Sequence, residues 1–149
     1  MDFGVLLGLA YHRFVDELHE HLAARGFGDM RSNFGYAFKV LAVESLTTSQ
    51  LAARLKITPQ GAAKTVEEMV AAGYVVRVSD PTDGRVKRLV LTERCHEMMA
   101  AGHEFHLAFE AEMVAGLGPE RVAALREVLS AMVDRSDSPD SLARTLRRL

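Results

Sequence analysis

The sequence predicts a mainly α-helical chain with one small β-hairpin, an α+β fold arranged as a single domain. Its 149 residues are the usual size of one domain, and 48% hydrophobic with 26% charged residues is an ordinary globular composition. Apolar residues recur at three- and four-residue steps along most of the chain, whereas β-branched runs occur only at 74–78 and 86–91. Helices are therefore expected to build the fold, with one hairpin near its centre.

Composition and motifs exclude several classes of protein. No apolar run approaches the roughly 18 residues of a membrane span, and Met1-Asp2-Phe3 is not the basic start of a secretory peptide. The single cysteine, Cys95, cannot form an internal disulfide or a multi-cysteine zinc site. No Ser/His/Asp set, glycine-rich phosphate loop or suitably paired carboxylates indicate catalysis. We therefore expect a cytoplasmic protein that is not an enzyme, needs no cofactor and binds no membrane.

The N-terminal part of the chain is expected to form two helices. From Phe3 to Ala24 the apolar residues fall on one helical face, and the glycines at 26 and 28 end this helix. Ser32 or Asn33 can cap a second helix, whose 3.6-residue period continues to Leu46.

A helix-turn-helix is predicted next. Residues 47–55 form a short capped helix, and Lys56-Ile57 is long enough only for a turn. Thr58 then provides an N-cap and Pro59 the first position of another helix, which Gly73 ends. The expected buried stripe of that helix consists of Ala62, Val66, Met69 and Val70. The residues turned outward are Gln60, Gly61, Lys64 and Glu68. Glutamine and lysine are residue types that bind base edges or phosphates.

The two β-branched runs are predicted to pair as the hairpin. Pro81 and Asp83-Gly84 between them favour a turn with an exposed tip. Three cations lie at or near that tip: Arg85, Lys87 and Arg88. A hairpin that directly follows a helix-turn-helix and carries cations at its tip is a wing, an arm that can reach the groove beside the one that holds the helix.

Two further helices are expected after the wing. Residues 97–115 form a long helix that Gly116-Leu117-Gly118-Pro119 ends, and another helix runs from Val122 to Val133. A breaker at 136–139, with Ser138 as an N-cap, precedes a last helical turn or two that ends at Leu149. We divide the single domain, 1–149, into a winged helix-turn-helix core (32–94), a connecting helix (95–118) and two terminal segments (1–31 and 119–149). The terminal helices carry more apolar surface than one small core absorbs, so they are expected to form a homodimer.

The net charge of −2 conceals a segregation of charge along the chain. Residues 47–94 contain eight basic and five acidic residues, whereas the remainder contains ten basic and fifteen acidic ones. The middle of the chain is thus the only part whose field attracts a polyanion. The functional surface is expected there.

Three stretches of this central segment, 51–55, 69–77 and 80–92, carry a specific resemblance. The predicted wing tip, Asp83-Gly84-Arg85-Val86-Lys87, has the spacing D-x-R-x-K. On these residues the chain resembles the MarR family of bacterial winged helix-turn-helix regulators, and the order of its helices also fits. The resemblance implies a homodimeric regulator, more often a repressor than an activator, that binds a pseudopalindromic operator and is released by a small-molecule effector. It also implies that Arg85 enters the minor groove and that Asp83 steadies it, which agrees with the affinity of a guanidinium for a narrow groove.

Three features depart from the family pattern. Gly61 and Ala63 stand where relatives often have serine or threonine, so fewer side chains can read bases. Glu67 and Glu68 add negative charge to the recognition helix, which is tolerable only if its N-terminal half enters the groove. Cys95 replaces a usual glycine. It could sense oxidants only as a low-pKa thiolate, and a small buried residue at a helix start is the simpler interpretation.

The candidate DNA-binding residues are Thr47, Thr48, Thr58, Pro59, Gln60, Gly61, Lys64, Thr65, Asp83, Arg85, Lys87 and Arg88. The resemblance also implies a small organic effector between the dimer helices and the winged core. Its candidate contacts are Tyr11, Phe34, Tyr36, Phe38 and Phe105, although aromatic residues at helical spacing are more often core. The expected partners are therefore double-stranded DNA, a second copy of the chain and this effector.

Two alternative functions stay open. His96, Met99, His103, His106 and Glu110 share one helical face, so a metal-responsive regulator could use His103, His106 and Glu110 as ligands. That ligand set is incomplete, and we assign no metal. A winged-helix protein-interaction module without DNA binding is favoured by the acidic total charge and by Glu67-Glu68, and disfavoured by the intact wing motif.

Overall fold

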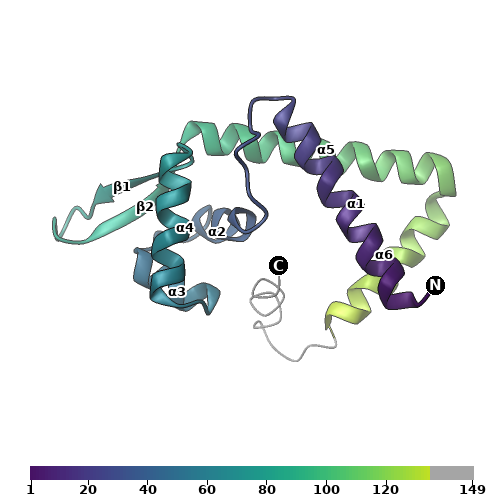
Figure 1. Cartoon of the computed structure of the whole chain (residues 1–149), viewed down its shortest axis with the longest axis horizontal. Coiled ribbons are helices and arrows are strands. Elements are labelled where there is room, and N and C mark those ends of the chain that lie inside the picture. The colour runs from purple at the N-terminus through teal and green to yellow at the C-terminus, as the bar shows by residue number, and fades with distance from the viewer. Residues whose placement is uncertain (135–149) are drawn as a thin grey trace. The chain divides into compact units, whose positions relative to one another are not determined.

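The computed structural model describes residues 1–134, which form six helices and one antiparallel pair of strands (Figure 1). They divide into two compact units, residues 1–102 and the segment that begins at His103. The prediction of a mainly helical chain with one hairpin is confirmed. Within the described residues, no helix is both long and apolar enough to cross a membrane.

Helices α1 (Phe3–Ala23) and α2 (Phe34–Leu41) open the first unit. The turn after α1 uses Gly26 at φ +89°, a left-handed conformation that suits glycine. The prediction that the second helix continues to Leu46 is wrong. Leu46 forms an isolated bridge with Leu89, whose N–H donates to the Leu46 carbonyl at 2.8 Å. The apolar Leu46 thus fits the helical period but meets its partner in the hairpin.

Helices α3 (Thr48–Leu55) and α4 (Pro59–Ala71) form the predicted helix-turn-helix. Thr47 and Gln50 make a reciprocal capping box at the start of α3. Lys56 adopts the left-handed conformation in the turn, at φ 53°. Thr58 caps α4 by accepting a hydrogen bond from the Gly61 N–H at 3.0 Å, with Pro59 at the first helical position. Local capping chemistry therefore sets both helix starts.

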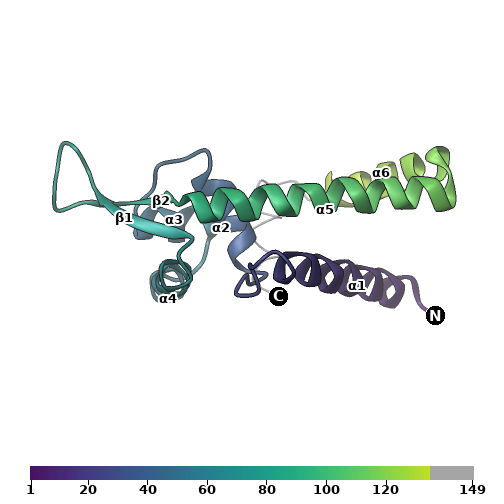
Figure 2. The same ribbon diagram turned by 90° about the horizontal axis from the view of Figure 1, so that it is seen from above.

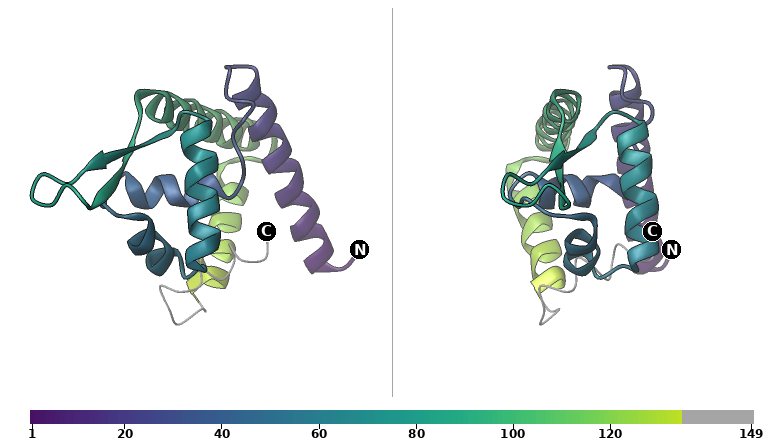
Figure 3. Two further views of the ribbon diagram at one scale, coloured as in Figure 1. Left: turned by 60° about the vertical axis from the view of Figure 1, so that its left-hand side comes forward. Right: turned by 90° about the vertical axis from the view of Figure 1, so that its left-hand side faces the viewer.

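Strands β1 (Val75–Ser79) and β2 (Lys87–Leu91) form the hairpin, which projects past α4 in Figure 2. They pair antiparallel, with Val75 opposite Leu91 and Val78 opposite Arg88. Val75, Leu89 and Leu91 are buried, and β2 contacts both α2 and α3. One face of the hairpin is therefore part of the core, and the left view of Figure 3 shows its turn extending beyond α2, α3 and α4 of the same unit.

The core of the first unit is centred on three aromatic rings. Phe34, Phe38 and Tyr74 are almost completely buried and pack edge to face, with ring centroids 5.5 to 6.4 Å apart. Val66 and Met69 of α4 belong to the same core. Burial of this side of α4 leaves its opposite side at the surface.

Helix α5 (Glu93–Leu117) begins four residues before the predicted start at 97. The Thr92 hydroxyl accepts a hydrogen bond from the Cys95 N–H at 3.3 Å, as a helix cap does. In the second unit, Gly118 turns the chain at φ +87° into α6 (Pro119–Asp134). Arg126 of α6 pairs with Glu110 of α5 at 2.7 Å. The predicted breaker and last helical turns, 136–149, lie outside the described residues.

Candidate nucleic-acid interface

The outer side of α4 presents the residues predicted to meet DNA. Gln60 and Lys64 are exposed, as are Thr58 and Pro59, whereas Gly61 and Thr65 are half-buried. This orientation follows from the other side of the helix, because Ala62, Val66 and Met69 have no exposed surface. Within residues 1–134, Lys64 forms no ion pair. Its ammonium group is therefore available to an external anion.

The helix cap formed by Thr58 leaves little room for a side chain at Gly61. A Cβ atom built on Gly61 would lie 3.0 Å from Oγ1 of Thr58, the hydroxyl that caps the helix. A side chain there would press on the cap. The departure from the family pattern at this position thus accompanies the Thr58 cap. Thr47 and Thr48 at the start of α3 are half-buried, and the Thr47 hydroxyl is engaged in the capping box.

Asp80 organises the turn of the wing. Its Oδ1 accepts from the N–H of Thr82 at 2.9 Å, the Thr82 hydroxyl at 2.6 Å and the N–H of Asp83 at 3.3 Å. The hydrogen bonds from Thr82, followed by that from Arg88, hold the pKa of Asp80 well below its usual value. Sequence reasoning missed this residue. Its signal is an aspartate two residues before Thr82, the spacing of an Asx-turn.

Asp83 and Arg85 are exposed at the tip of the wing. The Asp83 carboxylate accepts a hydrogen bond from the main-chain N–H of Arg85 at 3.0 Å. The aspartate therefore fixes the backbone that carries Arg85, whereas the Arg85 guanidinium forms no ion pair with any residue from 1 to 134. The tip presents a cation on a fixed turn.

Lys87 and Arg88 differ in their surroundings. Lys87 is exposed, and its Nζ donates to Oγ of Ser79 across the hairpin at 2.5 Å. Arg88 is half-buried. Its Nε donates to Oδ2 of Asp80 at 2.7 Å and its Nη1 to the carbonyl of Ser45 at 2.8 Å. The Arg88 guanidinium is thus committed to groups of its own chain.

Ion pairs within the chain leave fewer unpaired basic residues in the central segment than its count of eight suggests. Besides Arg88, three cations of the central segment pair with acids: Arg54 with Glu44 (2.9 Å), Arg77 with Glu67 (3.9 Å) and Arg94 with Asp29 (3.0 Å). Glu68 is likewise engaged, by Arg31 at 3.0 Å. Both acids of the recognition helix therefore have cationic neighbours, which reduces their repulsion of a polyanion. Lys64, Arg85 and Lys87 are the cations on the α4 and wing surface without such a pair among residues 1–134.

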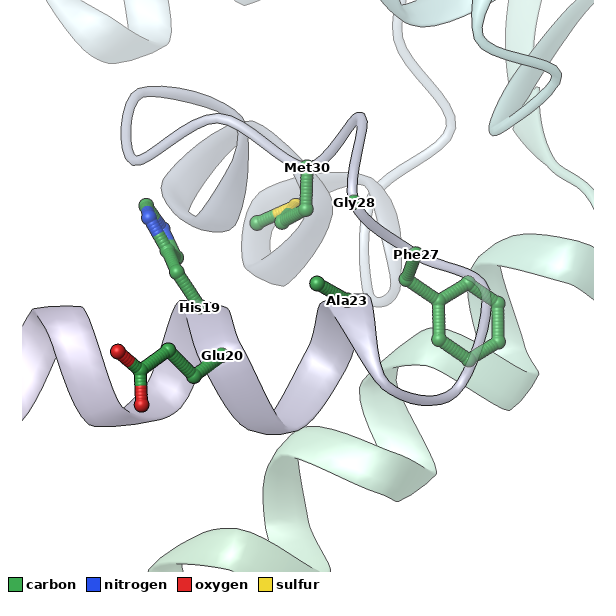
Figure 4. Close-up of a pocket in the computed structure, with 6 residues that line it drawn as sticks. All are labelled: His19, Glu20, Ala23, Phe27, Gly28 and Met30. Atoms are coloured by element: carbon green, nitrogen blue, oxygen red, sulfur yellow. The ribbon is translucent and has the colours of Figure 1, made fainter.

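The predicted effector residues occupy different surroundings. Phe34 and Phe38 are part of the core, Tyr11 is exposed and Tyr36 is half-buried. Burial raises the pKa of Tyr36, and nearby Tyr11 adds to this shift. Phe105 belongs to the second unit. A cavity of about 280 Å³ in the first unit is lined by other residues (Figure 4): His19, Glu20, Ala23, Phe27, Gly28 and Met30.

The possible metal ligands and the cysteine can be placed as well. Among residues 1–134, no three His, Cys, Asp or Glu side chains are grouped to hold a metal ion. Glu110 is paired with Arg126, while His103 and His106 are exposed on α5. Cys95 is fully buried, and this burial raises the pKa of its thiol to about 12. A thiol with that pKa is not the reactive thiolate that oxidant sensing requires.

Two short helices joined by a tight turn and followed by an exposed hairpin define a winged helix-turn-helix protein. The sequence profile of the MarR family matches residues 38–86, a segment that includes α3, α4 and β1. The resemblance drawn from the wing motif is thereby confirmed.

Solved structures agree on the fold of nearly the whole chain. RV1404 from Mycobacterium tuberculosis is 19% identical, with a TM-score of 0.73 over 93% of this chain and 97% of that one. FabT from Streptococcus pneumoniae in complex with DNA is 22% identical, with a TM-score of 0.65 over 89% and 96%. The S. aureus MepR-DNA complex is 18% identical, with a TM-score of 0.69 over 89% and 96%. A comparison with curated protein sequences found no match.

Proposed function

We propose that the protein is a homodimeric transcriptional regulator that binds double-stranded DNA at a pseudopalindromic operator. The observation that carries this proposal is the pairing of two exposed surfaces: α4 with Gln60 and Lys64, and the wing tip with Arg85. Both are built on fixed backbone, by the Thr58 cap and by the Asp80 and Asp83 turn bonds. The DNA complexes of the similarly folded FabT and MepR support the same use of this fold.

The two surfaces suit the two grooves of DNA. The N-terminal half of α4 enters the major groove, where Gln60 can bind an adenine edge and Lys64 a guanine edge or a phosphate. The wing reaches the adjacent minor groove, whose negative potential favours the Arg85 guanidinium. Glu67 and Glu68 lie further along the helix, near Arg77 and Arg31. That end of α4 is the one that tilts away from the DNA.

Dimerisation would complete the interface. Apolar side chains of α1 remain exposed in the single chain, among them Phe3, Leu6 and Leu9. Exposed apolar residues of α6 include Leu125, Val128 and Met132. Surfaces of this kind mark association sites. A two-fold dimer through these helices would present two recognition helices about 34 Å apart, which selects an inverted repeat. We further propose that a small organic effector releases the DNA and that the regulator acts as a repressor.

The experiment that tests the proposal is selection of bound sequences from random duplex DNA. We expect an inverted repeat whose half-sites lie about one helical turn apart. Sedimentation of the protein with and without the selected duplex then gives the stoichiometry, expected as two chains for each site. A monomer at micromolar concentration that selects no sequence would contradict both parts of the proposal.

A second candidate function is a winged-helix module that binds another protein. It is favoured by three valines on the outer face of the wing, Val76, Val78 and Val90, each more than 40% exposed. The same selection experiment separates the two functions, because a protein-interaction module enriches no DNA sequence.

A further inference from the structure

The Arg94 side chain, near the start of α5, joins two other segments of the first unit. Its Nε donates to the carbonyl of Ala72, the C-cap of α4, at 3.1 Å. Its Nη2 donates to the carbonyl of Gly26 at 3.2 Å and to both carboxylate oxygens of Asp29, at 3.0 and 3.1 Å. A single guanidinium thus connects the end of the recognition helix to the loop between α1 and α2, residues 24–33, here called the α1–α2 loop.

Asp29 is the anion of this cluster. It also accepts a hydrogen bond from the buried Tyr74 hydroxyl at 2.5 Å. Burial acts to raise the pKa of Asp29, but the hydrogen bonds from Tyr74 and Arg94 and the charge of Arg94 outweigh it and lower the pKa. The guanidinium carbon of Arg94 lies 5.2 Å from the Phe27 ring centroid and 5.0 Å from that of Tyr74. Charge, hydrogen bonds and ring contacts therefore hold the α1–α2 loop in one place.

The α1–α2 loop has two sides with different neighbours. Phe27, Gly28 and Met30 line the cavity beside α1, opposite His19, Glu20 and Ala23 (Figure 4). The residues between and after them bind elsewhere: Asp29 binds Arg94, and Arg31 pairs with Glu68 of α4. Adjacent Cα atoms are only 3.8 Å apart, so a shift of the cavity wall moves these two residues as well. Hydrogen bonds tolerate only small changes in length.

We propose that Arg94 is a positioning residue for the recognition helix, and that the α1–α2 loop adjusts this position according to how the adjoining cavity is filled. The inference rests on the proposed function, because it is α4 that reads DNA. The end of α4 depends on α5 and the residue before it: the Ala72 carbonyl accepts from Arg94 and the Gly73 carbonyl from the Thr92 hydroxyl at 2.6 Å. Loss of the Arg94 bond leaves a carbonyl at this helix end without that donor.

Filling the cavity tests the coupling without a ligand. Ala23→Leu adds three carbon atoms from the α1 side. We expect this variant to accelerate amide hydrogen exchange of residues 69–72 in the DNA-free protein on the order of fivefold, with a similar loss of operator affinity. Gly28→Ala adds only one Cβ from the loop side, at an ordinary van der Waals distance of 3.6 Å from the Cβ of Ala23, so it should have little effect on either measurement. Ala24→Leu is the matched control, because Ala24 is adjacent and does not line the cavity. It should leave both measurements unchanged.

The Arg94→Lys variant tests whether the effect of the cavity on α4 depends on Arg94. Arg94→Lys keeps the charge but cannot reproduce the forked set of bonds to Ala72, Gly26 and Asp29. We expect this variant to lower the ratio of operator affinity to random-duplex affinity, and Ala23→Leu to have no further effect on exchange in it. Unchanged exchange in Ala23→Leu would overturn the proposal, as would an effect of Ala23→Leu that persists fully in the Arg94→Lys protein. Absence of sequence-specific DNA binding by the wild type would contradict the proposed function alone, because the exchange measurement uses no DNA.

Discussion

Arg88 and Asp80 are joined by a 2.7 Å ion pair between Nε and Oδ2, and the same guanidinium donates to the Ser45 carbonyl. Arg88 therefore fastens the turn of the wing to the linker between α2 and α3. Because the Arg88 guanidinium is bound to groups of its own chain, we expect it to order the wing. The neighbouring cation of β2, Lys87, forms no ion pair among residues 1–134, and we expect it to contact a phosphate.

Replacement of each cation should separate these roles. Lys87→Ala should weaken binding to all duplexes and reduce the slope of log affinity against log salt by about 0.9, if Lys87 neutralises one phosphate. Arg88→Ala should weaken binding through a less ordered wing, with the slope unchanged and the fold destabilised by about 1 kcal/mol. Titrations at several salt concentrations, together with urea unfolding, measure both effects. A shallower slope for Arg88→Ala would instead show a phosphate contact.

Arg85 should contribute affinity without dictating a major-groove sequence, because the minor groove distinguishes little beyond A·T from G·C. Arg85→Ala should therefore bind much more weakly and still select nearly the same consensus. Asp83→Ala should act in the same direction but less, since it frees the backbone N–H of Arg85 and leaves the cation in place. Sequence selection with each variant checks this order. Wild-type affinity in Arg85→Ala would remove the wing from the mechanism.

The lowered pKa of Asp29 predicts that the free energy of unfolding depends on pH. The pKa of this carboxylate is lower in the folded protein than in the unfolded chain, so its contribution is present above the ordinary value of about 3.9. That contribution is lost as the pH falls through the lower, folded-state pKa. The free energy of unfolding of the wild type should therefore exceed that of Asp29→Asn near pH 6, and the difference should shrink below about pH 4. Urea unfolding at a series of pH values measures this difference. A constant difference would contradict the assignment.

Gly61 and Gly102 give a matched pair of helical glycines. In α5, a Cβ on Gly102 meets nothing within 4 Å, so Gly102→Ala should stabilise the protein by roughly 0.5–1 kcal/mol. In α4, the Cβ of Gly61→Ala would press on the Thr58 hydroxyl at 3.0 Å, which should cancel that gain. Thermal or urea unfolding compares the two variants. An equal stabilisation by both would show that the cap adjusts freely.

Cys95 should be chemically silent in the folded protein. Its burial and its pKa of about 12 leave almost no accessible thiolate at pH 8. We expect a thiol-specific reagent to label Cys95 only as fast as the protein opens, and to label it rapidly in urea. Fast labelling under native conditions would reopen a role in oxidant sensing.

The sequence predicted those features that depend on neighbouring residues. Thr47, Thr58 and Pro59 begin their helices as expected because caps act over three residues. The end of α2 was predicted wrongly because the partner of Leu46 is Leu89, far along the chain. The role of Asp29 was not predicted for the same reason, because its partner Arg94 lies 65 positions away. The contact of Arg88 with DNA stays a prediction that rests on its charge, whereas its ion pair with Asp80 depends on a residue on the other side of the hairpin and was not predicted.

The internal ion pairs of the central segment affect how such a regulator competes for its target. Binding to arbitrary DNA is almost entirely electrostatic, and Arg54, Arg77, Arg88 and Arg94 are already paired with acids of the same chain. A genome offers about 10⁶–10⁹ competing sites, so weak attraction to each of them leaves more of the protein free. With the proposed function, this weaker attraction would leave a larger fraction of the regulator available to its operator.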